Sequence, residues 1–254
     1  MAERWHPLGV ETRPESWFEG WFDQDYADLY ADRDAEEAEG GVQTSIRLLP
    51  ELREGPVLDL ACGSGRHLLA LRRHNPLAFG LDLSPVLLGR APRNLKPWLL
   101  RADMRHLPIR EGSLTGICLW FTPFGYFGDE ENRSLMASLS RRLRPGGVLW
   151  LDYFNPFLAL QTLVPDEVQE RGDLRVHIRR CLEGSRIVKR MHLLRLSTGE
   201  RREALESVHL YQPAELTEMA EQSGLDLAGT LGGYGGEPFA ARSPRWIGVF
   251  RRRA

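Results

Sequence analysis

Lysine is almost absent from this sequence. Of its 33 basic residues only Lys96 and Lys189 are lysines, which we interpret as a genome or stability bias rather than a functional signal. Acidic residues number 35, so the formal net charge at pH 7 is -2. A general polyanion binder normally presents a strongly basic face, and this charge balance argues against such a role.

Cysteine is also scarce. The chain has three cysteines, Cys62, Cys118 and Cys181, which is an odd number, and they lie far apart in the sequence. Neither a disulfide framework nor the close pairs of a zinc site can be read from this spacing. We therefore expect no metal, and a protein of the reducing cytoplasm.

Long apolar runs are missing as well. No stretch approaches the roughly 18 uninterrupted apolar residues of a membrane-spanning helix, and the first residues contain no apolar signal region. We expect no membrane partner. The 254 residues, 42% of them hydrophobic, suffice for one large α/β domain with a small insertion.

The most informative stretch runs from residue 56 to 71. A short apolar run at 57–60 predicts a buried parallel strand, the sequence Cys62-Gly63-Ser64-Gly65 predicts a tight turn, and the leucines after Arg66 have helical spacing. A strand, a glycine turn and a helix N-terminus together place backbone N–H groups beside any ligand that lies across the turn. The stretch is therefore a candidate nucleotide or cofactor site.

The glycine pattern discriminates among such ligands. A dinucleotide fingerprint requires a third glycine at position 68, which is a leucine, and a phosphate-binding P-loop requires a lysine that is not present. The sequence Asp-Leu-Ala-Cys-Gly-Ser-Gly at 59–65 instead resembles the first motif of the class I S-adenosylmethionine (SAM)-dependent methyltransferases. That family usually has a third glycine where this chain has Ala61, and we regard alanine as a mild departure.

Two further acids continue the resemblance. Asp82 ends a predicted second strand about twenty residues beyond the glycine turn, where an acid accepts hydrogen bonds from ribose hydroxyls in related folds. Its alternative role is to cap the next helix, but Ser84 followed by Pro85 already supplies a cap. After a third strand, Asp103 and Met104 match the family positions that contact the adenine amino group and the adenine ring.

The ends of strands four and five complete the pattern. A fourth strand at 114–120 leads into an aromatic segment, and Leu-Arg-Pro-Gly-Gly at 143–147 precedes the fifth strand at 148–153. Ligands of open parallel sheets lie outside the carboxyl ends of the strands, so this segment should line the site. Trp120 and Phe121 are expected beside the methionine portion of the cofactor, and Phe124 and Tyr126 at the start of the substrate pocket.

Residues 15–39 carry aromatic residues at helical spacing as far as Tyr30, followed by an acidic stretch. They predict one amphipathic helix, whose simplest role is to pack on the domain. In small-molecule methyltransferases of this type such a segment closes the site as a lid. The resemblance then makes Tyr26 and Arg33 cofactor contacts and Tyr30 a substrate contact.

An arginine-rich region follows the fifth strand. Alternation with a period of two predicts three antiparallel strands between 174 and 210. An RNA-binding sheet is one interpretation, but no aromatic residues interleave with the charges as base stacking requires. Pairing with Glu200, Glu203 and Glu206 on a solvated face is the interpretation that we favour. We therefore expect no nucleic-acid partner.

The last part of the chain predicts a helix at 213–223 and a closing antiparallel strand pair at 225–231 and 245–250. The loop between these strands is rich in glycine, which indicates a turn, and in related chains it adjoins the active site. Tyr234 and Phe239 are accordingly candidates for the substrate pocket. No convincing general base emerges, and the candidates are Tyr126 and His209.

These observations predict a Rossmann-like class I methyltransferase fold: a seven-stranded, mostly parallel sheet with helices on both faces, plus a small antiparallel β insertion. We expect a lid over 1–40, a SAM-binding core over 41–154, a substrate-covering insertion over 155–210 and the C-terminal part of the core over 211–254. The implied cofactor is SAM, with S-adenosylhomocysteine (SAH) as product. The implied cofactor contacts are Tyr26, Arg33, Asp59, Ala61, Cys62, Gly63, Gly65, Asp82, Leu83, Asp103, Met104, Trp120 and Phe121.

The function implied is methyl transfer to a small molecule, most plausibly at an amine nitrogen, by a monomer or homodimer. Alternatives are an RNA methyltransferase that uses the arginine-rich insertion and a non-catalytic protein that binds SAM or SAH.

Overall fold

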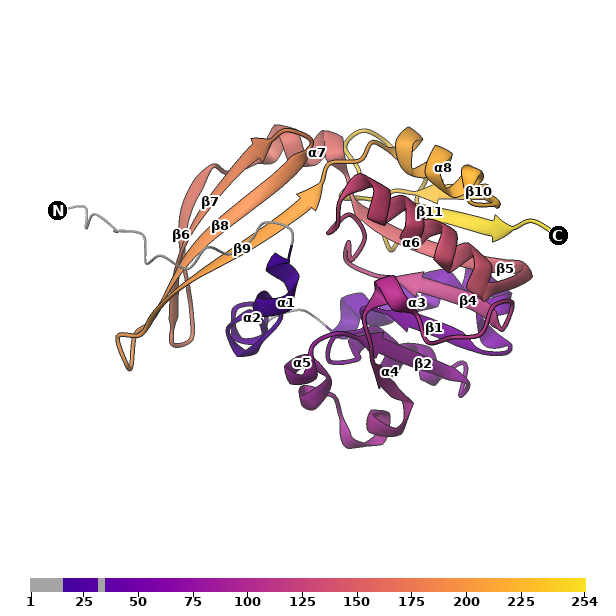
Figure 1. Ribbon diagram of the computed structural model, residues 1–254, viewed down its shortest axis with the longest axis horizontal. Helices are drawn as coiled ribbons and strands as arrows, with labels where there is room; N and C mark the ends of the chain where they lie inside the picture. The colour runs from indigo at the N-terminus through magenta and orange to yellow at the C-terminus, as the bar shows by residue number, and fades with distance from the viewer. Residues whose placement is uncertain (1–15, 32–34) are drawn as a thin grey trace.

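The computed structural model describes residues 16–31 and 35–254. Two sheets dominate it: a seven-stranded sheet flanked by helices, and a separate four-stranded sheet that projects from one end (Figure 1). The described helices include none that is long and apolar enough to cross a membrane.

The larger sheet has the strand order β10-β11-β5-β4-β1-β2-β3. Strands β1 to β5 pair in parallel, and β11 pairs antiparallel with both β5 and β10, so that β11 alone runs against the other strands. The strands are β1 (Val57–Leu60), β2 (Ala78–Asp82), β3 (Leu99–Arg101), β4 (Leu114–Leu119), β5 (Leu143–Phe154), β10 (Leu225–Leu231) and β11 (Arg245–Arg252). This confirms the predicted fold class.

Strand β1 pairs with β2 on one side and with β4 on the other. The chain thus moves outward in one direction from β1 to β3 and then returns to continue through β4 and β5 in the other direction. Such a reversal opens a crevice at the carboxyl ends of the central strands. The glycine turn that follows β1 lies at this crevice.

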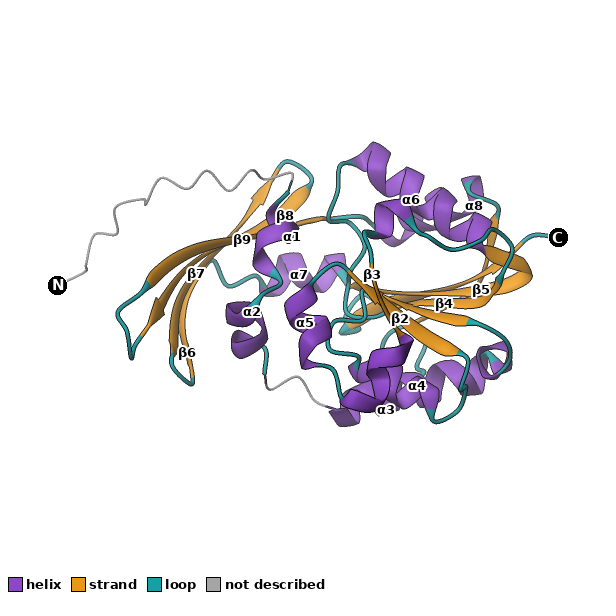
Figure 2. Ribbon diagram, turned by 60° about the horizontal axis from the view of Figure 1, so that its bottom comes forward, coloured by secondary structure: helices purple, strands orange, loops and turns teal. Residues whose placement is uncertain are grey.

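Helices cover both faces of the larger sheet (Figure 2). The central strands β1 and β4 are buried along their whole length because both faces are covered, which explains their mostly apolar sequences. The helices are α3 (Ala35–Leu48), α4 (Arg66–Arg72), α5 (Pro85–Arg90), α6 (Asp129–Arg142) and α8 (Pro213–Gln222), with 3-10 helices at Pro50–Arg53, Arg93–Trp98 and Met104–His106.

Strand β5 begins earlier than predicted. It starts at Leu143, but the residues at 144–147 bulge out of the ladder, since Leu114 pairs with Leu143 and Gly116 already pairs with Val148. Gly146 lies in this bulge with φ of 73°. The predicted turn therefore exists, inside the strand rather than before it.

The smaller sheet follows β5 and a short helix, α7 (Pro156–Thr162). The prediction of three strands is wrong here, because the sheet has four in sequential antiparallel order. The missed strand, β6, has an outward face of charged residues and little apolar alternation. The four strands are β6 (Asp166–Arg171), β7 (Leu174–Glu183), β8 (Arg186–Arg195) and β9 (Arg201–His209).

The predicted single helix at 15–39 is also wrong. Two short helices, α1 (Trp17–Trp21) and α2 (Gln24–Leu29), precede α3. The break falls at Asp23, whose side chain accepts hydrogen bonds from the N–H groups of Asp25 and Tyr26 and so starts a new helix. We call residues 16–31 the lid segment; it lies between the smaller sheet and α5 (Figure 1).

Candidate functional site

A cavity of about 370 Å³ lies at the carboxyl ends of the central strands. Its floor is formed by residues after β1, β2, β3 and β4, and its roof by the lid segment. Among the predicted cofactor and substrate contacts, those that line it are Tyr26, Tyr30, Asp59, Ala61, Cys62, Gly63, Asp82, Leu83, Asp103, Met104, Trp120, Phe121 and Tyr126.

The glycine turn has a strained backbone. Ala61, Gly63 and Gly65 have φ of 58°, 57° and 81°, a region that disfavours side chains. This explains why the first position is a glycine in the resembling family, and alanine there is a costlier departure than predicted. Gly65 does not line the cavity: a Cβ added to it would lie 2.8 Å from the Leu95 side chain, so glycine is needed there for packing behind the turn.

Asp82 fixes the turn that follows β1. Its Oδ2 accepts the Gly63 N–H at 2.8 Å and its Oδ1 accepts the Ser84 N–H at 2.8 Å. Burial raises the pKa of Asp82, while these N–H donors oppose the rise. Ser84 caps α5, as predicted, so the carboxylate of Asp82 is not needed as the helix cap.

Asp59 is the most unusual group in the cavity wall. The side chain is 1% exposed, and its Oδ2 has no hydrogen-bond partner among the described residues. Burial, helped by the nearby Asp82 carboxylate, raises the pKa of Asp59 to about 8. A buried acid with an unpartnered oxygen at a cavity is suited to a cationic or hydrogen-bonding ligand.

Asp103 lies across the cavity floor from the glycine turn. Arg105 binds it with a bidentate guanidinium, with a shortest distance of 2.7 Å, and also donates its backbone N–H at 2.8 Å. These contacts outweigh burial and hold the pKa of Asp103 below its usual value. The carboxylate therefore stays ionised and can accept a further hydrogen bond from a ligand.

Aromatic and basic side chains form the wall beyond β4. The His67 ring stacks on Trp120 with centroids 4.7 Å apart and planes 3° from parallel. The Phe121 ring lies between two guanidinium groups, with Arg66 at 4.8 Å and Arg245 at 4.4 Å from its centroid. Of these residues, sequence reasoning missed Arg66 and Arg245 as parts of the site.

A buried carboxylate in β5 holds this wall in place. Asp152, which is 0% exposed, accepts the Phe121 N–H at 2.7 Å, the Tyr234 hydroxyl at 2.5 Å and Arg245 Nε at 2.5 Å. Its carbonyl oxygen accepts the Thr122 N–H at 3.1 Å. Phe121 and Thr122 have φ of 61° and 62°, a costly conformation for such residues, and these bonds stabilise it.

The lid segment closes the cavity with aromatic side chains. Phe22 stacks on Tyr126 with centroids 5.8 Å apart, and Tyr26 lies 4.8 Å from both Phe22 and Tyr30. The roof thus depends on contacts within the lid segment and on contacts with Tyr126 and Phe127 in the loop after β4.

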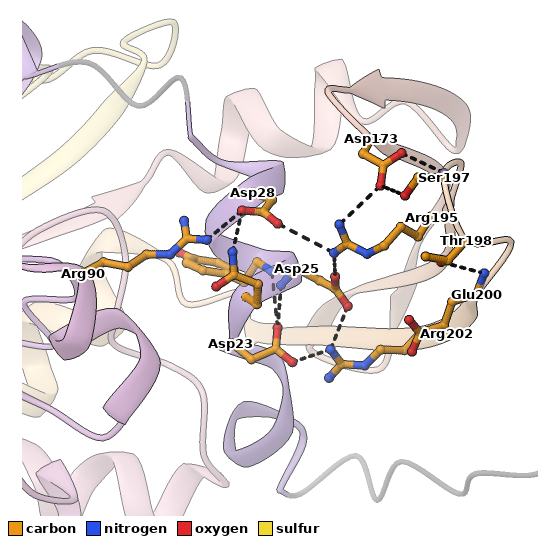
Figure 3. A network of polar contacts seen from close by, with 12 residues as sticks. Asp23, Asp25, Asp28, Arg90, Asp173, Arg195, Ser197, Thr198, Glu200 and Arg202 are labelled. Atoms are coloured by element: carbon orange, nitrogen blue, oxygen red, sulfur yellow. Dashed lines mark hydrogen bonds and ion pairs between the residues drawn. The ribbon is translucent and has the colours of Figure 1, made fainter.

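Ion pairs fasten the lid segment on both sides (Figure 3). Toward the core, Arg90 donates to Asp28 at 2.6 Å. Toward the smaller sheet, Arg195 and Arg202 donate to Asp25 at 2.7 and 2.9 Å, and Arg202 also binds Asp23. These side chains are between 16 and 35% exposed, so they are neither buried nor fully solvated.

Several predicted substrate contacts lie elsewhere. Phe124 is fully buried in the core near Tyr211, and Tyr234 is a support for the β4 wall rather than a lining residue. Phe239 packs against the core, outside the cavity. His209 stacks on Tyr211, with centroids 3.9 Å apart, and also lies outside the cavity lining. Arg33 falls outside the described residues.

Most arginines of the smaller sheet bind carboxylates, although not those predicted. Arg175 pairs with Glu170, Arg179 with Asp166, Arg180 with Glu167 and Arg190 with Glu183. The acids come largely from β6, the missed strand. The described residues contain no group of three or more His, Cys, Asp or Glu that could hold a metal ion.

Comparison with known proteins supports the resemblance drawn from the motifs. Residues 57–147 match the family model described as "Methyltransferase domain". A stretch of 161 residues is 30% identical to a dTDP-4-amino-2,3,4,6-tetradeoxy-D-glucose N,N-dimethyltransferase of Saccharopolyspora spinosa, covering 60% of this chain and 64% of the relative. The chain thus spans less than two thirds of the curated relatives that it matches first.

Solved structures extend the likeness to the whole fold. A SAM-dependent methyltransferase from Clostridium acetobutylicum has a TM-score of 0.77 at 18% identity, covering 91% of this chain and 98% of that one. The sugar N-methyltransferase KedS8 from Streptoalloteichus has a TM-score of 0.70 at 22% identity, covering 100% of this chain and 99% of that one. At these identities the likeness concerns the fold.

Proposed function

We propose that this chain, whose residues 57–147 match the methyltransferase domain model, transfers the methyl group of SAM to an amine nitrogen of a small molecule. One observation carries the proposal. The cavity brings the glycine turn, Asp59, Asp82 and Asp103 together under an aromatic roof. The three acids lie toward the ends of three separate strands, β1, β2 and β3. We assign one acid each to the methionine, ribose and adenine parts of SAM.

The residues present fit the cofactor. Asp59, whose Oδ2 is buried and unpartnered among the described residues, would face a cationic part of SAM, and Asp82 would accept ribose hydroxyls. Asp103 and Met104 would hold the adenine, and Trp120 and Phe121 the methionine portion. When bound, SAM supplies a methyl carbon whose bond to sulfur breaks with the electron pair remaining on sulfur.

The chain's own residues have the task of alignment. The roof excludes water, and the fixed walls hold the acceptor in line with the methyl group, so that proximity supplies most of the rate enhancement. We assign these tasks to a lid over 1–40, a core over 41–154 completed by 211–254, and a cover over 155–210, in a cytoplasmic enzyme.

Support for an amine acceptor comes from the relatives. The Saccharopolyspora spinosa protein is named for methylation of an amino-sugar nitrogen, and KedS8 for sugar N-methylation. An RNA acceptor is less well supported, because the arginines of the smaller sheet are largely engaged with carboxylates.

Two measurements test the proposal. Isothermal titration calorimetry of the protein, after removal of bound ligand, should show SAM and SAH binding at one site. Mass spectrometry should then show methylation in a panel of small primary amines, which includes dTDP-4-amino-2,3,4,6-tetradeoxy-D-glucose, simple amino sugars and amino acids. Absence of SAH binding would contradict the cofactor assignment, and SAH binding with methylated hydroxyls but no methylated amine would contradict the acceptor.

A further inference from the structure

Lys189 is one of two lysines in the chain, and it is buried. It lies on β8 with 9% of its surface exposed, whereas the other basic residues of that sheet are arginines. Burial of an ammonium group is costly unless it is paired, and lysine differs from arginine in that its point charge is compact and can shift its pKa. This position therefore calls for an explanation beyond a general preference for arginine.

The partners of Lys189 are a tyrosine and a glutamate. Its Nζ lies 3.3 Å from Glu206 Oε2, directly across the strand pair, and donates to the hydroxyl of Tyr30. Tyr30 in turn donates its hydroxyl to Glu206 Oε1 at 3.0 Å. Trp21 Nε1 donates to the same oxygen at 2.7 Å, which fixes the carboxylate from the lid side.

This cluster connects the cavity to solvent. Tyr30 lines the cavity, while the Glu206 side chain is 21% exposed on the other side of the cluster. The Tyr30 side chain thus extends from the cavity wall to an oriented carboxylate. Such an arrangement is suited to carry a proton out of the cavity.

Proton removal is the one chemical task that the floor of the cavity does not perform. A primary amine is mostly protonated at neutral pH, and only the neutral form has the electron pair needed to attack a methyl group. The floor acids are assigned to the cofactor, and His209 lies outside the cavity lining. Of the other titratable groups in the lining, His67 stacks on Trp120 and Tyr126 on Phe22, whereas Tyr30 contacts a carboxylate that can take up its proton.

We propose that Tyr30, Lys189 and Glu206 form a proton relay that deprotonates a cationic primary-amine acceptor; this inference rests on the proposed function. The ammonium of the acceptor gives a proton to Tyr30 Oη while the Tyr30 hydroxyl proton moves to Glu206 Oε1. The acceptor nitrogen keeps its electron pair and becomes neutral, Tyr30 is unchanged overall, and Glu206 becomes protonated and releases the proton to solvent.

Each member has a distinct task. Tyr30 is the catalytic residue, because it touches the acceptor, whereas Glu206 and Lys189 act through it. The Lys189 ammonium stabilises negative charge on the Tyr30 oxygen as its proton leaves. Other charged groups that face the cluster are Arg180 and Glu167, which pair at 2.5 Å on the sheet side, and Asp25, Asp28, Arg195 and Arg202 on the lid side.

The pH profile of methylation tests the relay. The full-length protein is assayed with SAM and the amines of the panel above between pH 6 and 10, in the wild type and in Tyr30→Phe, Glu206→Gln and Lys189→Met. Loss of a general base costs on the order of 100-fold in kcat, so each variant should lose about that factor at pH 7. The deficit should shrink about tenfold per pH unit up to the pKa of the amine, because solvent then deprotonates the acceptor.

Controls separate the relay from a structural role. Lys189→Arg keeps the charge and should restore activity relative to Lys189→Met. Glu203→Gln, on the same strand and paired with His192 rather than with Tyr30, and Lys96→Met, the other lysine, should leave the profile unchanged. SAH affinity measured by calorimetry should stay within about threefold of the wild type in all variants, which shows that they are folded.

The outcomes distinguish the two proposals. If the wild type does not bind SAH, the cofactor assignment fails. If it binds SAH but methylates no amine of the panel, the amine acceptor and the relay fall together. If it methylates an amine and the three variants keep the wild-type pH profile, the relay alone is overturned.

Discussion

The floor and the roof of the cavity are held by different kinds of interaction. The floor rests on strained turns whose backbone N–H groups bind buried carboxylates, as at Asp82 and Asp152. The roof rests on aromatic contacts and on ion pairs that are partly open to solvent. Buried bonds of the first kind keep one geometry, whereas partly solvated pairs form and break at little cost. The floor should therefore keep one geometry, whereas the roof should be able to open and close.

The largest effect should follow from a change behind the floor. Asp152→Asn removes the charge that Arg245 and Tyr234 share and leaves a mostly buried guanidinium unpaired. We expect a loss of about 3 kcal/mol in the free energy of unfolding, measured in urea. As the matched control, Asp226→Asn breaks an exposed pair with Arg253 and should cost less than about 0.5 kcal/mol. Equal losses in both variants would show that the contacts of Asp152 stabilise the fold no more than an exposed ion pair does.

A second change acts on the floor itself. Asp82→Ala removes the acceptor of the Gly63 N–H and the proposed ribose contact. Since hydrogen bonds to charged groups contribute about 1.5 to 3 kcal/mol, SAH affinity measured by calorimetry should fall on the order of 100-fold. Asp129→Ala also removes a carboxylate that accepts two hydrogen bonds, but this carboxylate lies outside the cavity lining, and its loss should leave SAH affinity unchanged.

The pH dependence of stability sharpens the comparison further. The pKa of Asp59 is raised to about 8 in the folded protein, so between pH 4 and 8 the folded state binds a proton that the unfolded state has released. Stability from this group is fully present below about pH 4 and is lost progressively as the pH rises to about 8. The Tm of the wild type should therefore fall more between pH 5 and 9 than that of Asp59→Asn, as followed by calorimetric scans. If the Tm of the two proteins falls equally with pH, the pKa of Asp59 is not raised in the folded protein.

The smallest effect belongs to the roof. Arg202→Gln breaks the pairs with Asp23 and Asp25, and such half-exposed pairs contribute about 0 to 1 kcal/mol each. SAH affinity should weaken by no more than about fivefold, and wild-type affinity should fall modestly between low and high salt. Arg175→Gln breaks a pair with Glu170 that does not involve the lid and should leave both unchanged. If Arg202→Gln lost as much SAH affinity as Asp82→Ala, the roof would be held as rigidly as the floor.

The sequence predicts the floor well because its signals are local. A strand, a glycine turn and an acid at a fixed distance can be read within some thirty residues, and Asp82 and Asp103 do line the cavity. The strain at Ala61 cannot be read from the sequence, since its φ of 58° is a property of the folded turn. The role of these residues in binding SAM stays a prediction.

The roof and the acceptor end could not be predicted in the same way. Tyr30 meets Glu206 across 176 positions of sequence, and no periodicity encodes that contact. Glu206 was interpreted as a surface partner of arginine, and the two lysines as a bias, whereas Lys189 is buried beside Tyr30. Asp152 carries a weak local signal, an acid within an otherwise apolar buried strand, which points to a buried polar network.

The roof has a consequence for the time that a ligand stays bound. Because the lid segment contributes Phe22, Tyr26 and Tyr30 to the cavity wall, movement of this segment should influence how fast a bound molecule enters and leaves. When the ion pairs of the lid segment are weakened, ligand entry and ligand exit should both become faster. The lid segment would then control the rate of turnover, and the floor the affinity.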